Sequence, residues 1–553
     1  MNLTNLGLAG LNAAQSRLMT SGHNINNAAT PGFNRQSVLV STAGAQSTGS
    51  GYIGRGVQVD SVQRAYDGFL FRQLVSAQTT GASLASYGNE IVQINNLFAD
   101  RTVGISPALQ RFFDGVQAVA SAPADAAARQ ELLGRAGSLV GQINDANAFL
   151  NAQRENINTQ IATVVTQINS HVERVHDLNR QITIAKATQS GQPPNDLLDQ
   201  RDQVIAELSQ LVDVRVLEQD GRVNLTVGNG QVLLGGDTVF PLHATESADD
   251  PSRTVVAYTA ISGASGATIS VQLREEAIKG GSLGGLMNYR SQALDLVQND
   301  LGRMAAGLAI AINSVHANGH DLNGVPGAKF FTLGDPKVIR GAGNGSTAEI
   351  TATFNLGDAA LASKLTVADY RIEFDGTDFT VTSLPDRATV YKGATLSAAV
   401  MVPSLDITGV PVAGDSWLVQ PARALAGDIR LELTDPARIA AASVGAGPAN
   451  GGNALGLANL QTAKILGSGT MSFNESFSQI VNKVGVLTQQ NSTASKAQST
   501  LIQQNFAAQQ AVSGVNLNEE YVNLDRYQEQ FRAASRLIDV SATLFDTLLS
   551  LRT

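Results

Sequence analysis

Apolar and small residues recur every seven positions at both ends of the chain. The N-terminal repeat combines an apolar row with a row of small side chains, namely Leu11, Leu18 and Ile25, and Gly7, Ala14, Ser21 and Ala28. The C-terminal repeat has larger side chains, namely Leu517, Leu524, Phe531, Ile538 and Phe545, with Tyr527, Ala534 and Leu548 on the adjoining row. A seven-residue repeat predicts a coiled-coil seam, and small residues let a partner helix approach closely. Either helix alone would also suit an ordinary bundle core, but a repeat at both ends favours pairing of the two termini.

A polar, turn-forming stretch, SGHNINNAATPGF, follows the N-terminal repeat at residues 21–33. Pro31 disfavours helix at Thr30, and Pro31-Gly32 suits a turn that Phe33 is placed to anchor. The seven-residue rows continue through the stretch, so its three asparagines fall on other faces of the helix. A solvated C-terminal turn is the alternative interpretation. At the other end of the chain, Asn516 followed by Glu519 predicts the start of the last helix.

The segment between Pro123 and Pro193 contains no proline and predicts a very long helix. Its apolar positions alternate spacings of four and three, namely Ile157, Ile161, Val164, Ile168, His171, Val175, Leu178, Ile182 and Ala185. His171 on this seam is expected to be packed and not to bind a ligand. Another helix is expected over 195–214, with Asn195 as a plausible N-cap.

Two more helical segments are expected over 280–319 and 473–501. The second has an apolar seam that Asn491, Gln498 and Asn505 interrupt at seven-residue intervals. Buried amides at seam positions reduce stability but fix the register of a helix pair.

Strand patterns occupy two regions between the helices, at 214–275 and 336–450. Both alternate apolar and polar residues, and Asp375-Gly376 predicts a hairpin in the second region. Residues 41–56 are rich in Gly, Ser and Thr and are expected to form a connection before a short strand.

The organisation is nested, with helical ends enclosing a helical body that encloses β insertions. We therefore expect an elongated, multidomain α+β protein with a terminal coiled coil, a long-helix body and an inserted, mostly β outer domain. The expected domains are 1–40 with 510–553, then 41–335 with 451–509 including a small β subdomain at about 214–275, then 336–450.

Composition and charge exclude several classes of function. The 553 residues are 43% apolar, which permits a large core. The net charge of −9 argues against nucleic acid as a partner. There is no cysteine, so disulfides and thiolate sites are excluded. The sequence shows neither an N-terminal signal-peptide pattern nor an apolar run long enough to span a membrane, so no membrane insertion is expected.

No motif makes a positive case for catalysis. His316 and His320 have the i, i+4 spacing of a zinc-binding helix but lack the adjacent glutamate. Asp196, Asp199 and Asp202 are expected to be solvent-exposed beside Arg201. We therefore expect no catalytic residue, no cofactor and no metal.

The two ends resemble the signatures of a known family. LNAAQSRLMTSGHNINNAATPGFNRQ and GVNLNEEYVNLDRYQEQFRAASRLIDVSATLFDTLLSL are similar to the terminal signatures of the bacterial flagellar rod, hook and hook-associated axial proteins. The internal stretches NDLLDQRDQVIAELSQLVDV and INSVHANGHDLNGVPGAKFF resemble those of the first hook–filament junction subunits within that family. The resemblance covers both ends and most of the helical body, and it is weaker over 336–450.

The resemblance implies a structural adapter ring between hook and filament, needed for filament assembly and motility. The implied partners are other copies of the chain, the hook protein, the second hook–filament junction protein and an export chaperone. The implied location is the extracellular flagellum, reached by type III export without a cleaved signal peptide. Another axial subunit of hook or distal rod, and a secreted adhesin acting through its outer β domain, are the alternatives.

The resemblance also assigns roles to particular residues. The assembly residues are Leu11, Ala14, Leu18, Ile25, Ala28, Leu517, Leu524, Phe531, Ile538 and Phe545. The chaperone-binding residues are Leu524, Phe531, Ile538 and Phe545. The family motif comprises Asn24, Asn26, Asn27, Thr30, Pro31, Gly32 and Phe33, and its asparagines are expected to hydrogen-bond neighbouring subunits of a tube.

Overall fold

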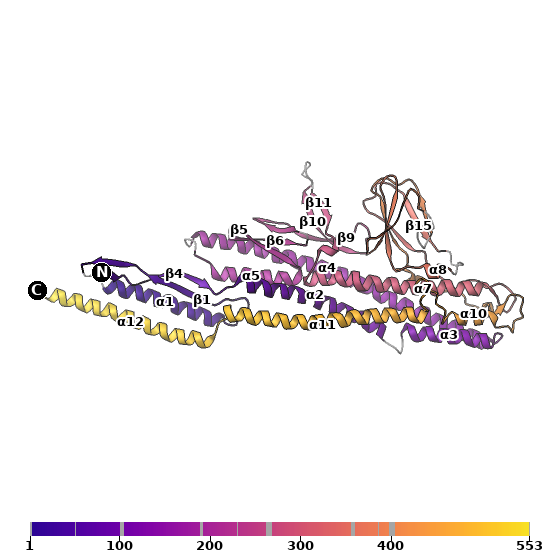
Figure 1. Ribbon diagram of the computed structural model, residues 1–553, viewed down its shortest axis with the longest axis horizontal. Coiled ribbons are helices and arrows are strands. Elements are labelled where there is room, and N and C mark those ends of the chain that lie inside the picture. The colour runs from indigo at the N-terminus through magenta and orange to yellow at the C-terminus, as the bar shows by residue number, and fades with distance from the viewer. Residues whose placement is uncertain are drawn as a thin grey trace.

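The computed structural model describes residues 3–49, 51–99, 104–188, 192–219, 221–228, 230–261, 268–354, 360–384, 386–396 and 404–551. The molecule is a long rod of helices with both described ends of the chain at one tip and two β units on one side (Figure 1). This arrangement confirms the expected α+β class with helical ends, a helical body and inserted strands.

The first and last helices pack along each other at the tip (Figure 1). They are α1 (Leu3–Asn27) and α12 (Leu517–Ser550). Contacts near both ends show that they run antiparallel, because Thr4 lies against Ser541 and Arg17 against Gln530. As expected, Asn516 caps the start of α12, because its side chain accepts the backbone N–H groups of Asn518 and Glu519.

The body is built from long helices with one continuous apolar core. Its helices are α2 (Gly68–Ala99), α3 (Ile105–Ser121), α4 (Ala126–Thr188), α5 (Asn195–Leu211), α6 (Gly281–Tyr289), the π-helical turn η3 (Arg290–Leu294), α7 (Asp295–Ala317), α9 (Leu425–Asp428), α10 (Gly452–Asn459) and α11 (Phe473–Ser513). The 3-10 turns η2 (Glu275–Ala277) and η4 (Pro436–Arg438) complete it. Ser472 and Glu475 form a capping box that begins α11, and Gly514 follows its last residue.

The buried seam of α4 differs from the expected one in its middle. Val165 and Val172 are buried at 3% and 1% exposure, in place of the expected Val164 and His171. An α-helix has 3.6 residues per turn, so a strict seven-residue row drifts around it and the neighbouring position takes over the core. His171 therefore lies half-buried on the flank, 3.8 Å from Glu207.

The amides that interrupt the seam of α11 bind the backbone of α2. Asn491 Nδ2 donates to Leu84 O at 3.0 Å, and Gln498 Nε2 donates to Ala77 O at 2.8 Å. Seven residues further on, Asn505 Nδ2 donates to a third carbonyl of α2 at 3.4 Å. Because a slip of one residue would break all three bonds, these amides hold the register of the α2–α11 pair.

The stretch expected to be a connection is a long β-hairpin beside α1. It consists of β1 (Gln36–Thr42), β2 (Ala45–Thr48), β3 (Gly51–Gly54) and β4 (Val57–Arg64), with β1 paired to β4 and β2 to β3. The small and polar residues suit a two-stranded ribbon whose outer part is exposed, and this composition gave no alternation of apolar residues in the sequence. A Cβ on Gly56 would lie 3.0 Å from the Leu6 side chain, so the ribbon packs closely on α1.

The strands expected over 214–275 form two antiparallel sheets against α4. The first has the order β5-β6-β7-β8, with β5 (Val214–Gln219), β6 (Arg222–Val227), β7 (Gln231–Gly235) and β8 (Thr238–Val239). The second has the order β11-β10-β9, with β9 (Leu242–Glu246), β10 (Thr254–Ile261) and β11 (Thr268–Gln272). Val223, Leu225 and Val256 carry the body core into these sheets, which we call the small β unit.

The inserted β domain has a separate core around Ile372, Val381 and Trp417. Its larger sheet has the order β14-β20-β16-β17-β18, and β15 pairs with β19. The elements are β14 (Lys337–Arg340), β15 (Glu349–Thr353), α8 (Ala360–Lys364), β16 (Asp369–Phe374), β17 (Phe379–Leu384), β18 (Thr389–Gly393), β19 (Ser404–Thr408) and β20 (Ser416–Gln420). The expected Asp375-Gly376 hairpin joins β16 to β17, with Gly376 at φ +101°.

The chain returns to the body sooner than the strand pattern suggested. The sequence placed everything up to 450 in the inserted domain, but Ile429, Leu433 and Ile439 are buried in the core of the helical body. Short strand pairs in this segment join β13 (Phe331–Thr332) to β21 (Arg430–Leu431), and β12 (Gly319–His320) to β22 (Ala442–Ser443). The alternating pattern arose because one face of this extended segment packs on helices.

Gly302 allows the returning chain to lie directly on α7. A Cβ at Gly302 would be 1.8 Å from Ala422 O, which is impossible without moving the backbone. We expect Gly302→Ala to destabilise the fold by about 1–3 kcal/mol. Gly134→Ala in α4 is the control, because nothing lies within 4 Å of its Cβ position, and it should stabilise by about 0.5–1 kcal/mol. Thermal unfolding of both variants measures the difference, and equal midpoints would contradict this account.

Candidate functional site

The small row of α1 faces α12. Gly7, Ala14 and Ser21 are buried, and a Cβ on Gly7 would lie 2.7 Å from Ile538 Cγ1. The apolar row of Leu11, Leu18 and Ile25 is half-buried. The close approach of the two helices therefore depends on the absence of side-chain volume on α1. Ala28, expected on the same row, lies beyond the end of α1 and is exposed.

The expected apolar row of α12 is only partly covered by α1. Leu524, Phe531 and Ile538 are half-buried, whereas Leu517 and Phe545 at the two ends are 43% and 60% exposed. The fully buried positions of α12 are Glu520, Ala534 and Ser541.

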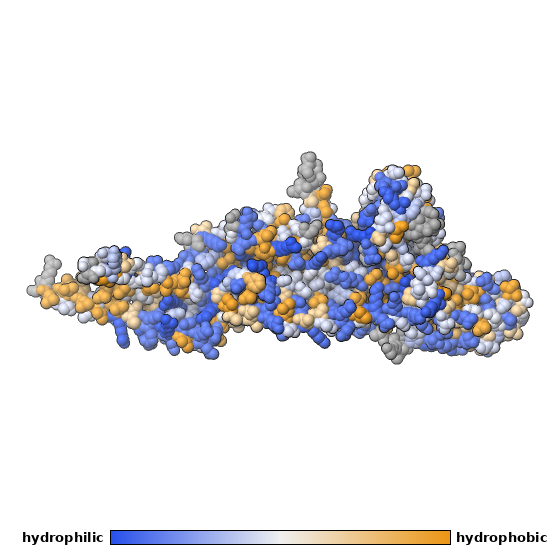
Figure 2. Space-filling view, viewed as in Figure 1, coloured by the Kyte–Doolittle hydropathy of each residue, from blue (hydrophilic) through white to orange (hydrophobic). Residues whose placement is uncertain are grey.

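The last turns of α12 have no cover at all. Residues 542–550, which we call the α12 overhang, are exposed on every face of the helix. The exposed large apolar side chains there are Leu544, Phe545, Leu548 and Leu549, at 49%, 60%, 67% and 51% exposure. Figure 2 shows hydrophobic residues gathered along this tip of the molecule. An uncovered apolar surface of this kind marks an interaction site.

The turn after α1 fastens the tip to the body, and Asn24 is its anchor. Asn24 is 1% exposed, donates to Gln36 O at 2.8 Å and accepts from Gln36 N at 2.9 Å. The expected role of Asn24 in hydrogen bonding to neighbouring subunits is therefore wrong, because both its amide atoms are used within the chain. Asn27 also bonds inside the chain, to His23 O at 3.0 Å, whereas Asn26 is exposed.

The remaining motif residues shape the exit from α1. Thr30 N donates to Asn27 O at 2.9 Å, and Pro31 is exposed. Gly32 has φ +77°, a left-handed conformation that favours glycine. Phe33 packs edge-to-face on the His23 ring at 5.3 Å, which places the anchor that the sequence indicated.

A buried acidic pair on α5 receives this turn. Asp199 accepts from Asn34 N at 2.9 Å and from Arg64 Nη1 at 2.7 Å, and Arg64 also binds Asp202 at 2.7 Å. These aspartates are 5% and 7% exposed, so the expectation that they face solvent is wrong. Asn195 is likewise not the N-cap, because Pro194 holds that position and the Asn195 side chain donates to Val62 O.

The ion pairs of Arg64 with Asp199 and Asp202 hold this contact together, but burying these charged groups costs desolvation free energy. Burial raises the pKa of Asp199 and of Asp202. Burial alone would lower the pKa of Arg64, but the two carboxylates outweigh it and raise this pKa. Because one guanidinium is shared between two buried carboxylates, it offsets only part of the desolvation cost of each.

The first residue after the turn, Arg35, connects the joint to the C-terminal helices. Its Nε donates to Glu520 at 2.8 Å and its backbone N–H donates to Ser513 O at 2.8 Å, where α11 ends. We call the contacts of residues 24–36 with the hairpin, α5 and the α11–α12 boundary the terminal joint.

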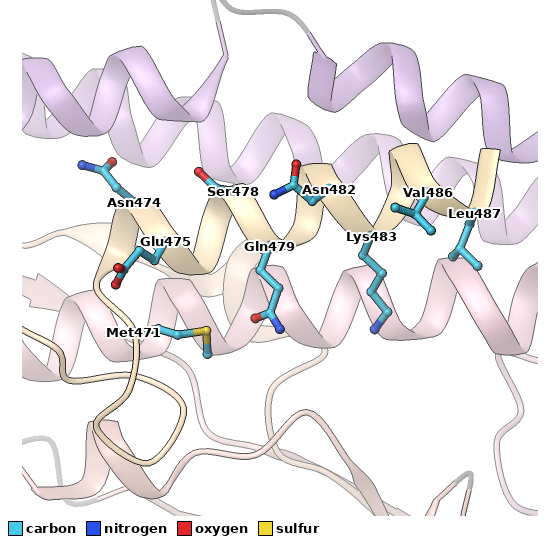
Figure 3. A pocket seen from close by; sticks show the side chains of 9 residues that line it. All are labelled: Met471, Asn474, Glu475, Ser478, Gln479, Asn482, Lys483, Val486 and Leu487. Atoms are coloured by element: carbon cyan, nitrogen blue, oxygen red, sulfur yellow. The ribbon is translucent and has the colours of Figure 1, made fainter. Parts of the chain in front are cut away.

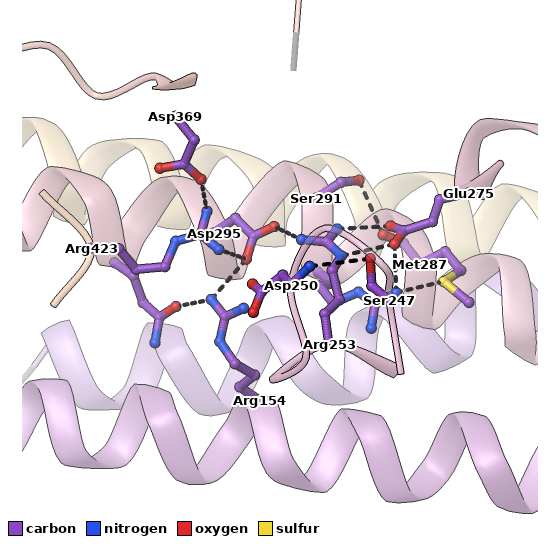
Figure 4. Close-up of polar contacts among 12 residues, drawn as sticks. Arg154, Ser247, Asp250, Arg253, Glu275, Met287, Ser291, Asp295, Asp369 and Arg423 are labelled. Atoms are coloured by element: carbon purple, nitrogen blue, oxygen red, sulfur yellow. Dashed lines mark hydrogen bonds and ion pairs between the residues drawn. The ribbon is translucent and has the colours of Figure 1, made fainter. Parts of the chain in front are cut away.

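A second buried polar cluster joins the body to both β units (Figure 4). Its charged members are Arg154, Asp250, Arg253, Glu275, Arg290, Asp295, Asp369 and Arg423. Asp295 is central, since it binds Arg154 at 2.9 Å and Arg253 at 2.7 Å. Burial alone would raise the pKa of Asp295, but the guanidinium groups of Arg423, Arg253 and Arg154 hold it well below its ordinary value.

The described surface gives no metal site, and its groove along α11 is shallow. A shallow groove of about 770 Å³ lies along the start of α11, and Figure 3 shows it lined by Met471, Asn474, Glu475, Ser478, Gln479, Asn482, Lys483, Val486 and Leu487. In the described part of the chain, no group of three or more His, Asp or Glu side chains is arranged to hold a metal ion. His316 is fully buried, with Nδ1 at 2.7 Å from Ala328 O and Nε2 accepting from Ala440 N at 2.9 Å. Across the residues described, no helix has the length and apolar character to cross a membrane.

Comparisons with known proteins decide the family. Residues 91–331 match the model described as flagellar hook-associated protein FlgK helical domain, and residues 339–421 match the D2-like domain of flagellar hook-associated protein 1. Flagellar hook-associated protein 1 of Salmonella typhimurium is 37% identical over 100% of both chains, and that of Escherichia coli K12 is 36% identical over 100% of both. The chain belongs to the flagellar hook-associated protein 1 family. It is therefore a structural hook–filament junction protein of the extracellular flagellum and not an enzyme.

A solved structure supports the same fold. The flagellar hook junction protein FlgK from Burkholderia pseudomallei superimposes with a TM-score of 0.73 at 27% identity, covering 80% of this chain and 100% of that one. A more distant hook-associated protein 1, from Bacillus subtilis, is 24% identical over 98% of this chain and 96% of its own length.

Sequence reasoning missed most residues of the joint and of the buried cluster. Arg64 and Asp199 are separated by more than a hundred positions, and nothing in the sequence pairs them. The one available signal was the i, i+3 spacing of the acids on α5, which places them on one helix face without indicating whether that face is buried.

The terminal joint predicts different effects for two neighbouring asparagines. Asn24→Ala leaves the buried N–H and C=O of Gln36 without partners, so we expect a loss of about 1–3 kcal/mol in the local stability of β1. Hydrogen exchange of the β1 amides measures this loss. Asn26→Ala is the matched control, because Asn26 is exposed on the same turn, and its exchange should remain at the wild-type rate. Equal exchange in the two variants would contradict the anchoring role of Asn24.

Proposed function

We propose that the protein forms an adapter ring that joins hook to filament and that its α1–α12 pair lines the inner tube of that ring. The observation that carries this proposal is the α12 overhang, a helix end whose large apolar side chains are exposed. Burying a large apolar side chain stabilises an interface by about 1.5–3 kcal/mol, so four such side chains supply much of the free energy of association.

The covering surface is proposed to be the terminal pair of neighbouring copies. Leu8 and Met19 of α1 are 49% and 68% exposed, and Val522 and Val540 of α12 are 68% and 53% exposed. The pair therefore presents apolar residues along its length and not only at its tip. A helix pair with uncovered faces on both members suits packing into a multi-helix wall.

The proposed position of each domain in the ring follows the nested order of the chain. Residues 1–40 with 510–553 would form the inner tube, 41–335 with 451–509 the supporting body, and the inserted domain, first assigned to 336–450, the outer surface. The axial partners would be the hook protein on one side and the second hook–filament junction protein on the other. Nucleic acid and membrane insertion play no part in this proposal.

We also propose that an export chaperone covers α12 before assembly. Leu524, Phe531, Ile538 and Phe545 share one helix row, which suits capture in an apolar groove. This row and the overhang would aggregate if left uncovered at high concentration, so a chaperone would keep the chain soluble until export.

The overhang predicts a defect in assembly without a defect in folding. Phe545→Asp with Leu548→Asp places charge on exposed positions, so thermal unfolding of the monomer should be unchanged. Cells carrying this variant should make hooks without filaments and release flagellin into the medium. The control is Val410→Asp, which changes a residue 82% exposed in the inserted domain and should leave filaments intact. Normal filaments in the overhang variant would contradict the proposal.

Truncation tests the chaperone separately. Deleting residues 510–553 should abolish binding of the export chaperone, since the apolar row is removed. Calorimetric titration of the purified chaperone with full-length and truncated protein measures the loss. An unchanged affinity would place the chaperone site elsewhere.

A further inference from the structure

The small β unit and the inserted β domain lie side by side on one face of the body (Figure 1), although α6 and α7 separate them in sequence. A cleft of about 1020 Å³ runs between them, with Asp249 and Glu276 on one wall and Arg371 and Arg387 on the other. Residues 247–253, which connect β9 to β10 and which we call the bridging loop, contact three parts of the molecule.

Three consecutive residues of the bridging loop each bind the inserted domain. The pairs are Ala342 N to Ala248 O at 2.9 Å, Arg371 Nη1 to Asp249 Oδ2 at 3.0 Å, and Gln420 Nε2 to Asp250 Oδ2 at 3.3 Å. The first is a backbone bond, the second joins two partly exposed side chains, and the third joins two buried side chains. Contacts at three successive positions fix the orientation of the inserted domain relative to the loop better than a single hydrogen bond would.

The other half of the loop is held by the body. Asn158 of α4 donates to Ser252 O at 2.8 Å and accepts from Thr254 N at 3.0 Å. Arg253 binds Asp295 at the start of α7 at 2.7 Å and Glu275 at 2.8 Å, as Figure 4 shows. The loop is therefore fixed at both the inserted domain and the body.

The covalent attachment of the inserted domain is narrow by comparison. The chain enters the domain just before β14 and leaves it just after β20, so two adjacent strands carry the whole domain. At this root, Arg423 binds Asp369 of the domain and Asp295 of α7. Beside this root, Ala362 and Leu365 of the domain are buried in one apolar cluster with Ala306 and Ile310 of α7. These contacts lie close to the root and leave the far side of the domain the least constrained.

We propose that the bridging loop is an orientation latch, which with the Arg387–Glu276 pair locks the inserted domain to the small β unit so that the two form one rigid outer unit. The Arg387–Glu276 pair closes the cleft at 3.1 Å. Both ion pairs are partly exposed, so each is weak alone. They act at a distance from the root, where a small attractive force resists rotation most effectively. This inference does not depend on the proposed ring, because it concerns the isolated chain.

Charge reversal across the cleft tests the latch. Asp249→Lys with Glu276→Lys sets like charges against Arg371 and Arg387, and both sites are exposed enough to leave folding intact. The chain has no cysteine, so Val390→Cys in the inserted domain and Val486→Cys in α11 accept spin labels specifically. Both valines are exposed, at 48% and 54%. Double electron–electron resonance then reports the distribution of distances between domain and body.

The wild-type latch should give one narrow distance peak, and the reversed variant should give a broad distribution or lose that peak. Adding Arg371→Glu and Arg387→Glu to the reversed variant restores opposite charges and should restore the narrow peak. Lys392→Ala is the control, since its partner Asp375 lies within the same domain, and it should leave the peak unchanged. A broad wild-type distribution, an unchanged peak in the reversed variant, or no recovery in the charge-swapped variant would each overturn the latch.

Discussion

Antiparallel packing of the first helix on the last is the constraint on which the rest of the structure depends. Because α1 and α12 lie together, every element between them must form an excursion that returns to its starting point. The same condition repeats inside, where α2 pairs with α11 and the inserted domain leaves and re-enters the body through adjacent strands. Each pairing buries an apolar face that a single long helix would expose, and helical stability in proteins comes mainly from such packing.

Small residues set how close these elements approach, and buried polar groups set their register and angle. Gly7 makes room for α12 and Gly302 for the chain just after β20, and a side chain at either position would push its neighbour away. The Asn491 and Gln498 amides then select one alignment of α11 on α2. Buried polar contacts add less stability than apolar packing would, but a misaligned partner leaves them unsatisfied, so they discriminate among arrangements.

The polar clusters occur where separately folded parts meet. Arg64 and Asp199 lie at the terminal joint, and Asp295 lies where the body meets both β units. Such positions transmit orientation from one part to the next. These clusters therefore fix how the terminal helices and the two β units are held on the body.

Repeating patterns made the long elements predictable from the sequence. The seven-residue rows located α1 and α12, and the alternating stretches located the strands of both β units. This worked because apolar residues on the buried face of a helix or strand recur with the period of that element. The small row of Gly7, Ala14 and Ser21 even indicated which face would be approached closely. The function was inferred from the family signatures at the two ends, because the repeat patterns indicate structure and not function.

Tertiary structure alone decided which polar residues are buried and where extended segments pack. Asn24 and Asp199 look like surface residues in sequence, because the groups that satisfy them come from other elements. The segment around Ile429 reads as part of a β domain, yet it packs on helices. The core position at Val165 also depended on how α4 turns against its neighbours. A local pattern records the period of an element, whereas the partner of a buried polar group is fixed only when distant segments meet.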